Sequence, residues 1–472
     1  MDAPPVPLSQ GIARGSDVGL RLDLKNDGDG ILALKWDGGE DQIHDSQVVG
    51  VLQETRNKEV QPQWILRVVP LHSSPEVTKS MFAFESLRVT SLPRNYLERH
   101  MLPGAPEHLL VPPNADGSRN LHVVVSIRSG TGQAQQYFDD VLSKALVAIG
   151  LDRDTYHVHP TKSDKSIMEI AEKIILPRAN QGIRQTIVLL SGDGGIVDIV
   201  NTLLSASQSD EYIKPIIGLI PMGTGNALAN SSGLNRDATS GLGRIFRGTP
   251  RNIPSFTTRF SLGSVFLTDE GRKTESMPLQ SGCGIVHGVV VCSWALHASL
   301  VSDSDTTEYR KFGAQRFQMA AKELMTPADG SAPHVYNGKI TLYKTDERGQ
   351  EIAEEIPDTK TSYIVATLVS NFEERLTISP ASKPLDGQLR VLRFGDISGA
   401  HVLRLMGMAM RGGGHERDVM AQYVAINGLK IQFDESDSRW RRVCVDGKIV
   451  QVDEGGWMEV RRGNKDIVNL VV

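Results

Sequence analysis

The sequence of 472 residues contains little cysteine, only Cys283, Cys292 and Cys444. Three cysteines in a chain of this length provide neither a disulfide framework nor a zinc-binding pattern. The histidines are scattered, without a His-Glu-x-x-His motif or a Cys/His cluster, so we expect no metal site built from protein ligands alone. This cysteine usage fits a reducing compartment and predicts a cytoplasmic protein.

The sequence also lacks a block of lysine and arginine, and its formal net charge is -5. Both features argue against a nucleic-acid-binding protein. The N-terminal "MDAPPVPLSQG" lacks the basic and then apolar regions of a secretory signal. The apolar and charged fractions, 40% and 23%, are ordinary for a globular protein of about two or three domains.

One apolar stretch, residues 284–301, approaches the length of a membrane-spanning helix. It contains His287 and His297 together with glycine and serine, and no basic flank follows closely. We therefore predict a buried strand that runs on into a second buried segment, with a membrane span as the alternative.

The pattern of apolar residues divides the chain into three regions. Residues 1–110 contain several strand-like segments, at 19–36 (two strands around a DG turn), 63–71 and 82–89, and predict a β-rich N-terminal extension. After a linker rich in proline, glycine and asparagine, residues 120–250 alternate between strand and helix, which predicts a doubly wound α/β domain. Its first helix has apolar residues at helical spacing from Phe138 to Ile149. Residues 251–472 are again rich in strands, with helical segments near 311–325 and 401–410, and predict a mainly antiparallel sandwich, whose last strands are candidates to return to the α/β domain.

Three glycine-rich loops, at residues 128–132, 191–195 and 221–226, each follow a predicted strand of the α/β domain. Such loops lie at the carboxyl edge of a parallel sheet, where ligands bind. Glycine lets backbone N–H groups approach a ligand closely, and the helix that follows favours negative charge. The three loops together predict a phosphate-binding site, although the sequence has neither a P-loop nor a protein-kinase signature set.

Asp193 lies in the second of these loops. The helix N-terminus beside it tends to keep its carboxylate ionised. Beside a phosphate site, such a carboxylate serves either a metal ion or the proton of an acceptor hydroxyl. The alternative is an N-cap or Asx-turn aspartate without a chemical role.

Five motifs resemble those of the sphingosine kinase and diacylglycerol kinase family, in the order of that family, between residues 123 and 450. "SGDGGIVDIVNTL" resembles the nucleotide loop, "PMGTGNALA" the second signature in its sphingosine kinase form, and "SIRSGTGQA" the first phosphate loop. "SWALHASLVSDSDTTEYRKFGAQRF" is similar to a segment of sphingosine and ceramide kinases, and "VCVDGKIV" resembles the closing V-D-G-E strand.

The resemblance implies a two-domain fold like that of NAD kinases and diacylglycerol kinases, with ATP and Mg²⁺ between an α/β domain and a β-rich domain. It implies transfer of the γ-phosphate to a lipid hydroxyl, here of a sphingoid long-chain base, by an enzyme that contacts membranes peripherally. A diacylglycerol or ceramide kinase, and a lipid- or nucleotide-binding protein with weak or no activity, are the alternatives. The sequence leaves the oligomeric state open.

The resemblance also implies roles for individual residues. Asp193 matches the general base, and Asp303 matches the acid that grips the head group of a sphingoid base. The positions that match ATP-binding residues are Ser129, Gly130, Thr131, Gly132, Thr161, Ser191, Gly192, Gly194, Asp198, Gly223, Thr224, Asn226, Arg310, Arg316 and Gly447. By local rules alone, the two arginines are surface residues and Asp303 belongs to a solvated turn.

The sequence departs from the family pattern at three places. Ser126-Ile127 replaces Asn-Pro in the first loop, and Asp198 replaces the usual glutamate. Lys448 stands where the closing motif has glutamate, which reverses a charge near the nucleotide. The first and last of these departures motivate the alternative of a binding protein.

Overall fold

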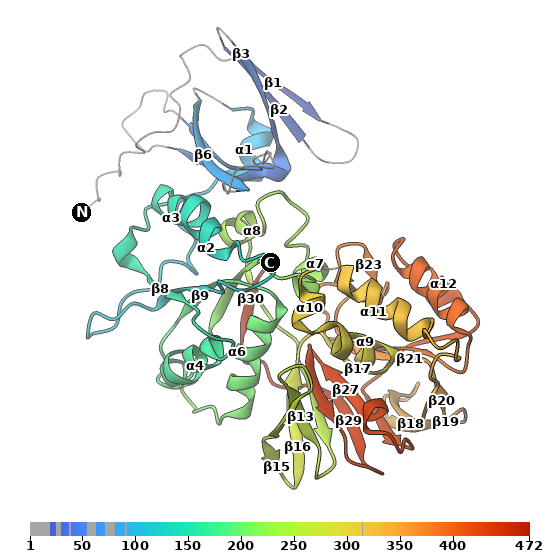
Figure 1. The fold of residues 1–472 in the computed structure, drawn as a ribbon. Helices are drawn as coiled ribbons and strands as arrows, with labels where there is room; N and C mark the ends of the chain where they lie inside the picture. Colours follow the sequence, from blue (N-terminus) through green and yellow to red (C-terminus); the bar gives the residue numbers. More distant parts are fainter. Residues whose placement is uncertain are drawn as a thin grey trace.

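The computed structural model describes residues 19–24, 30–36, 39–53, 63–70, 81–89, 92–313 and 315–472. Figure 1 shows the N-terminal strands at the top, the α/β part below them and the β-rich part at the lower right.

The N-terminal region contains two small antiparallel sheets, of strand orders β1-β2-β3 and β4-β5-β6. Their elements are β1 (Gly19–Leu24), β2 (Gly30–Trp36), β3 (Gly39–His44), β4 (Val48–Gln53), β5 (Gln63–Pro70), β6 (Phe82–Val89) and α1 (Arg94–His100). The predicted DG turn at residues 25–29 lies outside the described residues. Val49, Leu66 and Val68 share a core cluster with helical residues of the α/β part, so the second sheet packs directly on it.

The α/β part is built on a sheet of order β11-β30-β10-β9-β7-β8, parallel except where β11 pairs with β30. Its strands are β7 (Leu121–Val125), β8 (His157–Pro160), β9 (Thr186–Ser191), β10 (Ile216–Pro221), β11 (Pro250–Asn252) and β30 (Asn469–Val471). Along β9, Ile187 and Leu189 join one core cluster while Val188 and Leu190 join another. Both faces of the sheet are therefore buried, as the predicted doubly wound arrangement requires.

Helices cover both faces of this sheet. Their bounds are α2 (Ala134–Tyr137), α3 (Ser143–Ala148), α4 (Ser166–Ile170), α5 (Leu176–Asn180), α6 (Asp193–Ser205), α7 (Ala227–Ser232) and α8 (Leu242–Arg247). Short π-helical segments, residues 138–142 and 171–175, connect α2 to α3 and α4 to α5. The apolar residues predicted for the first helix, from Phe138 to Ile149, are buried.

The β-rich part consists of two eight-stranded sheets whose inner faces share one apolar core. Phe256 of one sheet and Trp294 of the other both belong to this core, so the two sheets form a sandwich. The first sheet contains β12 (Phe256–Phe260), β15 (Leu279–Gln280), β16 (Cys283–Gly288), β18 (Tyr336–Thr345), β19 (Glu351–Ile356), β20 (Lys360–Thr361), β26 (Gly428–Phe433) and β29 (Trp457–Arg462). The second contains β13 (Val265–Thr268), β14 (Lys273–Ser276), β17 (Val291–Ala295), β21 (Tyr363–Thr367), β24 (Arg390–Phe394), β25 (Ala421–Ala425), β27 (Arg442–Val445) and β28 (Lys448–Gln451).

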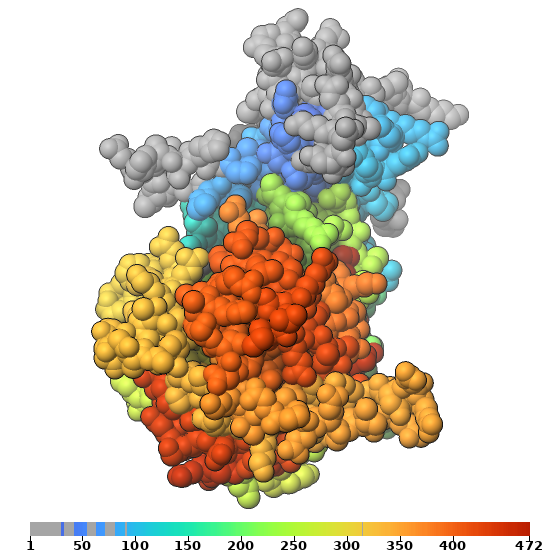
Figure 2. Space-filling model, turned by 90° about the vertical axis from the view of Figure 1, so that its right-hand side faces the viewer, coloured from blue at the N-terminus to red at the C-terminus, as the bar shows by residue number. Residues whose placement is uncertain are grey.

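Further short elements decorate the sandwich: α9 (Leu296–Ser304), α10 (Thr307–Arg310), α11 (Gln315–Met325), the hairpin β22 (Asn371–Glu373) with β23 (Leu376–Thr377), and α12 (Gly399–Ala409). Helices α11 and α12 fall in the two stretches, near 311–325 and 401–410, that the sequence predicts as helical. The segment around α12 lies at the centre of the face shown in Figure 2, with α10 and α11 beside it.

The apolar stretch at residues 284–301 forms β16, β17 and the start of α9. Most of its side chains are buried, including the large Trp294. Within the described residues, no helix has the length and apolar character needed to cross a bilayer. The predicted pair of buried segments is confirmed.

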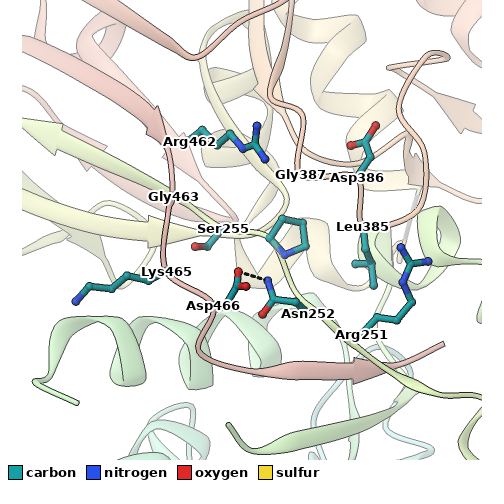
Figure 3. Close-up of a pocket in the computed structure, with 11 residues that line it drawn as sticks. Arg251, Asn252, Ser255, Leu385, Asp386, Gly387, Arg462, Gly463, Lys465 and Asp466 are labelled. Carbon is teal, nitrogen blue, oxygen red and sulfur yellow. Dashed lines mark hydrogen bonds between the residues drawn. The ribbon is translucent and has the colours of Figure 1, made fainter. Parts of the chain in front are cut away.

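The chain crosses between the α/β sheet and the sandwich twice, between β11 and β12 and again between β29 and β30. At these crossings the Asn252 Nδ2 donates to Asp466 Oδ1 over 2.6 Å (Figure 3). A cavity of about 340 Å³ lies beside them, and none of the predicted site residues lines it. The last strand, β30, thus belongs to the α/β sheet although the strands before it belong to the sandwich.

Candidate active site

The three glycine loops meet at the carboxyl edge of the α/β sheet. A Cβ added at Gly223 would lie 2.5 Å from the Gly192 Cα, and one added at Gly192 would lie 2.8 Å from the Gly223 Cα. Gly130 has φ +54°, and its added Cβ would lie 2.4 Å from the Met222 carbonyl oxygen. Only glycine fits these three positions without a shift of backbone.

Hydrogen bonds fix the loops in this contact. The Ser129 Oγ accepts from the Gly192 N–H over 3.0 Å, which joins the first loop to the second. The Asn226 side chain accepts from the Gly223 N–H over 2.8 Å and donates to the Gly223 carbonyl over 2.9 Å, which closes the third loop on itself. Asn226 has φ 53°, a conformation that asparagine tolerates better than most residues.

Thr161 joins the loop after β8 to the first glycine loop. Its Oγ1 accepts from the Ile127 N–H over 3.2 Å. Proline, which the family pattern has at position 127, carries no N–H. The isoleucine at position 127 therefore provides an N–H donor for Thr161 that proline would lack.

The other loop residues divide into buried and open ones. Ser191 is buried, and its Oγ lies 2.5 Å from a Cβ added at Gly195, so strand β9 and helix α6 pack closely there. Gly194 has nothing within 4 Å of an added Cβ and is exposed. The remaining predicted contacts, Thr131, Gly132 and Thr224, are exposed too. The open side of the cluster is thus available to a ligand.

Asp193 is the first residue of α6, and its carboxylate reaches the start of another helix. Its Oδ2 accepts from the Ala227 N–H over 2.7 Å, and its Oδ1 accepts from the Leu228 N–H over 3.0 Å. Ala227 and Leu228 are the first two residues of α7. Asp193 therefore joins the second glycine loop to α7, the helix that follows the third loop. The sequence analysis considered Asp193 as an N-cap residue, but of its own helix α6 and not of α7.

Burial raises the pKa of Asp193 above its usual range, and the two N–H donors oppose that shift. The helix N-terminus favours the ionised carboxylate, as the sequence predicted, but desolvation favours the protonated form. The sequence did not reveal this desolvation. Each carboxylate oxygen has two lone-pair sites and uses one for an N–H, so each can still accept a proton from a hydroxyl. The capping bonds and a general-base role are compatible.

Asp446 is a second acid with a desolvated carboxylate on a half-buried residue, and the sequence analysis treated it only as part of a hairpin turn. Its carboxylate accepts from the Val289, Val290 and Val291 N–H groups over 2.6 to 3.3 Å. Burial raises the pKa of Asp446 to about 7, against these hydrogen bonds, and the charge of Asp193 raises it further. The two acids therefore share one electrostatic neighbourhood, and the V-D-G match was the signal that could have identified Asp446.

Asp446 lies at φ 48° and Gly447 at φ 88°, in the turn between β27 and β28. This backbone places the acid inward and leaves Gly447 exposed with no neighbour within 4 Å of an added Cβ. The predicted nucleotide contact at Gly447 thus lies on an open turn directly after the buried acid.

The second and third departures from the family pattern meet in space. The Lys448 Nζ lies 3.1 Å from the Asp198 Oδ1. Asp198 is on α6 and Lys448 is the first residue of β28, so the ion pair joins the α/β part to the sandwich. Beside it, Asn201 of α6 exchanges two hydrogen bonds with the main chain of His287 on β16.

The two predicted phosphate-binding arginines share one acid, Asp305. Arg310 makes a two-pronged contact with its carboxylate, at 3.0 and 2.9 Å, and the Arg316 Nη1 lies 3.5 Å from it. The Arg316 Nε is buried without a hydrogen-bond partner. The structure therefore brings the arginines together with each other. Within the part of the chain that the structure describes, no hydrogen bond or ion pair joins either of them to the three glycine loops.

Asp303 is also paired with arginines. The Arg439 Nη2 lies 3.0 Å and the Arg442 Nη1 3.4 Å from its carboxylate oxygens. Its side chain is 26% exposed, so the carboxylate is still accessible. An incoming ammonium group would have to compete with two guanidinium groups, a constraint that the sequence did not reveal.

The described residues include no group of three or more histidine, cysteine, aspartate or glutamate side chains placed to hold a metal ion. Asp198, the acid that follows the glycine loop on α6, is already paired with Lys448. These residues therefore do not fit a magnesium ion held by the protein alone.

Comparison with known proteins identifies a catalytic domain within the α/β part. Residues 120–257 match the model of the diacylglycerol kinase catalytic domain. Sphingosine kinase 1 of Arabidopsis thaliana is 22% identical over 401 residues, which are 77% of this chain and 74% of that protein. Sphingosine kinase 2 of the same plant is 24% identical over 274 residues, 54% of this chain and 48% of that protein.

A crystal structure of a proposed diacylglycerol kinase from Bacillus anthracis str. Sterne has the same fold, with a TM-score of 0.50 and 14% identity. The likeness covers 75% of this chain and 97% of that one. The predicted two-domain α/β and β-sandwich architecture is thereby confirmed. The catalytic-domain match over residues 120–257 and the two relatives show that the chain is similar to sphingosine and diacylglycerol kinases, and they support a lipid kinase.

Proposed function

We propose that this lipid kinase transfers the γ-phosphate of ATP to a hydroxyl group of a sphingoid long-chain base. The observation that carries the proposal is the position of Asp193, a desolvated carboxylate fixed at the contact of three glycine loops. This arrangement supplies a phosphate cradle and a proton acceptor within one site.

In this proposal the glycine loops bind the triphosphate. The open surface at Gly194 and the first turn of α6 provide N–H groups for phosphate oxygens, with favourable dipole charge. Magnesium arrives with ATP, whose phosphate charge it neutralises. Thr131, Gly132 and Thr224 border the same open side as further contacts.

Asp193 accepts the proton of the lipid hydroxyl as that oxygen attacks the γ-phosphate. Its desolvation favours proton acceptance, because burial raises the pKa of its carboxyl group. Asp446, whose pKa lies near 7, adds negative charge when ionised and thereby strengthens Asp193 as a base.

The sphingoid base is favoured over diacylglycerol and ceramide by the names of two relatives and by Asp303. A sphingoid base carries an amine, and Asp303 offers a partly exposed carboxylate for it. We propose that its partners Arg439 and Arg442 yield to the incoming amine. A diacylglycerol or ceramide kinase would have no use for that charge.

Peripheral contact with a bilayer follows from a lipid substrate. Exposed apolar side chains occur on α12 and in the segment after it: Leu403, Met410, Val419 and Met420. Such side chains can insert into a membrane interface. We also propose functional domains at 1–110, 120–250 and 251–472, with β30 completing the second.

The experiment supplies the purified protein with labelled ATP, Mg²⁺ and, separately, sphingosine, dihydrosphingosine, ceramide and diacylglycerol. We expect label on the two sphingoid bases at a rate at least tenfold above ceramide and diacylglycerol. Label mainly on diacylglycerol or ceramide would overturn the choice of substrate. Nucleotide binding without label on any lipid would support the binding-protein alternative.

A further inference from the structure

The cavity at the two crossings between the α/β sheet and the sandwich contains none of the candidate active-site residues. Three segments line its volume of about 340 Å³ (Figure 3): residues 251–255 of the first crossing, residues 462–466 of the second, and residues 385–387 of a turn in the sandwich. Pockets that bind small molecules in proteins have volumes of about 300 to 1,000 Å³. The cavity is therefore large enough for a small ligand that contacts both halves of the molecule.

The lining contains three basic residues, Arg251, Arg462 and Lys465, and all three are exposed. Figure 3 shows Lys465 directed away from the other labelled residues, and its Nζ donates to the Gln208 Oε1 over 3.3 Å. The two arginines lie on opposite sides of the residues drawn, Arg251 on β11 and Arg462 at the end of β29. No carboxylate among the residues that the structure describes pairs with either arginine, so both guanidinium groups are available to a ligand.

The two acids of the lining are engaged by basic side chains outside it. The Asp386 Oδ2 lies 3.1 Å from the Arg390 Nη1, and the Asp466 Oδ2 lies 3.9 Å from the Lys214 Nζ. The Asp466 Oδ1 also accepts from the Asn252 Nδ2. The negative charges of the lining are thus offset from outside the cavity, whereas the charges of its two arginines are not. This balance favours an anionic ligand.

The backbone that carries the arginines is fixed before any ligand binds. The Gly463 N–H donates to the Ser255 carbonyl over 2.7 Å, and a Cβ added at Gly463 would lie 2.6 Å from the Ser255 Oγ. The Arg462 guanidinium lies against the turn at Gly387, where an added Cβ would be 3.4 Å from the Arg462 Nη2. The two crossings and the turn therefore hold one another in place, and a ligand has to order side chains only.

We propose that this cavity is a second ligand site, which binds the phosphate group of a small phosphate monoester between Arg251 and Arg462. A guanidinium group presents parallel N–H donors that match two phosphate oxygens, and a dianionic phosphate can accept from two such groups. Because Arg251 belongs to the α/β sheet and Arg462 to the sandwich, the bound phosphate links the two halves of the molecule at their crossings. The site does not depend on the proposed function, since neither ATP nor the lipid acceptor takes part in it.

The test measures phosphate binding by the full-length protein in the presence of Mg²⁺ and a saturating non-hydrolysable ATP analogue. Inorganic phosphate and glycerol 3-phosphate are titrated by calorimetry, and vesicles of phosphatidylcholine with and without phosphatidic acid are tested by sedimentation. Binding of the soluble phosphates would identify a soluble ligand. Binding only to vesicles with phosphatidic acid would identify a lipid head group with the same chemistry.

The arginines are tested one at a time. We expect Arg251→Met and Arg462→Met each to weaken binding by at least about tenfold, because each removes a charge-assisted contact. Lys465→Met is the matched control, since it removes the same charge from a side chain directed away from the cavity, and binding should stay within about threefold. No binding by wild type in any arm, an equal loss in all three variants, or binding that neither arginine variant weakens would overturn the proposal.

Thermal unfolding in the same buffer shows whether a variant has lost its fold and not its ligand. Because both arginines are exposed, their substitution should change the melting temperature by less than about 2 °C. The phosphate that binds should raise the melting temperature of wild type and of Lys465→Met, because it binds the folded state only. An equal rise in the double variant Arg251→Met with Arg462→Met would contradict a site between these two side chains.

Discussion

The glycine-loop cluster and the acid–arginine clusters around α9 to α11 are held together differently. The loops are fixed by backbone contacts, a few short side-chain bonds and one capping acid, all within residues 126–228. Asp303, in contrast, is paired with arginines more than 130 residues away, and Asp305 takes two arginines from its own segment. Backbone-built sites are rigid before the ligand arrives, whereas charge-paired sites must exchange partners to bind one.

We infer from this difference that the glycine loops bind ATP and the paired acids recognise the lipid head group. The loops form the same phosphate cradle with or without a lipid, because glycine contacts leave the backbone little room to move. The paired acids can change partners, and a salt bridge that is partly exposed costs little to break. Recognition of the lipid head group would then depend on exchange of ion pairs, and binding of ATP would not.

Among the binding effects, the largest is expected when the backbone contact between the glycine loops is disturbed. In Gly223→Ala the new Cβ would lie 2.5 Å from the Gly192 Cα, so backbone must shift. We expect ATP affinity to fall by at least about a hundredfold, equivalent to about 2.8 kcal/mol. Isothermal titration calorimetry with ATP and Mg²⁺ measures this loss.

Gly194→Ala is the matched control in the neighbouring loop. Its Cβ would meet nothing within 4 Å, and alanine favours the helix by about 1 kcal/mol. Its melting temperature should equal or exceed that of wild type. Because the proposed phosphate contacts lie at this surface, we expect ATP affinity to fall, but by less than in Gly223→Ala. ATP affinity of Gly223→Ala within threefold of wild type would refute a cradle shaped by that contact.

The buried acid Asp446 should make stability depend on pH. Its pKa of about 7 in the folded protein lies above the ordinary value of 3.8, so the folded state binds more protons between these values. The free energy of unfolding should therefore fall as pH rises from about 4 to about 7, by as much as about 4 kcal/mol from this group. Urea unfolding across that range measures the slope.

The variant Asp446→Asn cannot lose a proton there, so its pH slope should be flatter even if its stability is lower at every pH. Comparing slopes separates the charge of Asp446 from the hydrogen bonds that the amide fails to accept. Equal slopes for the two proteins would show that Asp446 is not titrating near neutral pH.

The smallest effect is expected from the paired acid Asp303. Asp303→Asn should raise the KM for sphingosine by about tenfold, because a charge-assisted hydrogen bond to the amine becomes a neutral one. The KM for ATP should stay within about twofold. A lowered melting temperature with both KM values unchanged would instead show that Asp303 only holds Arg439 and Arg442.

Much of the fold could be predicted from local pattern. The helical spacing from Phe138 to Ile149 and the short apolar strands identified the α/β layer, because each element buries a face of its own. The buried path of residues 284–301 was also predictable from its polar interruptions. The loops at Gly130, Gly192 and Gly223 were visible because glycine marks close backbone approach.

Contacts between distant segments could not be predicted in the same way. Asp193 was expected to cap its own helix or act in chemistry, yet it caps α7, a contact that depends on how two loops dock. The pairing of Asp198 with Lys448 spans 250 positions of sequence, so two departures that looked separate proved to be one feature. The V-D-G motif marked the position of Asp446, but its desolvation could not be predicted, because it depends on packing against distant segments.

The general-base role of Asp193 is tested by the rate of phosphate transfer to sphingosine in wild type and Asp193→Asn, with ATP affinity measured on the same samples. We expect a kcat lower by about 10² to 10⁴ in the variant, because the proton acceptor is lost. ATP affinity should change only a few-fold, since the loops remain in contact through Gly192 and Gly223. A kcat within tenfold of wild type would contradict the assignment of Asp193 as the general base.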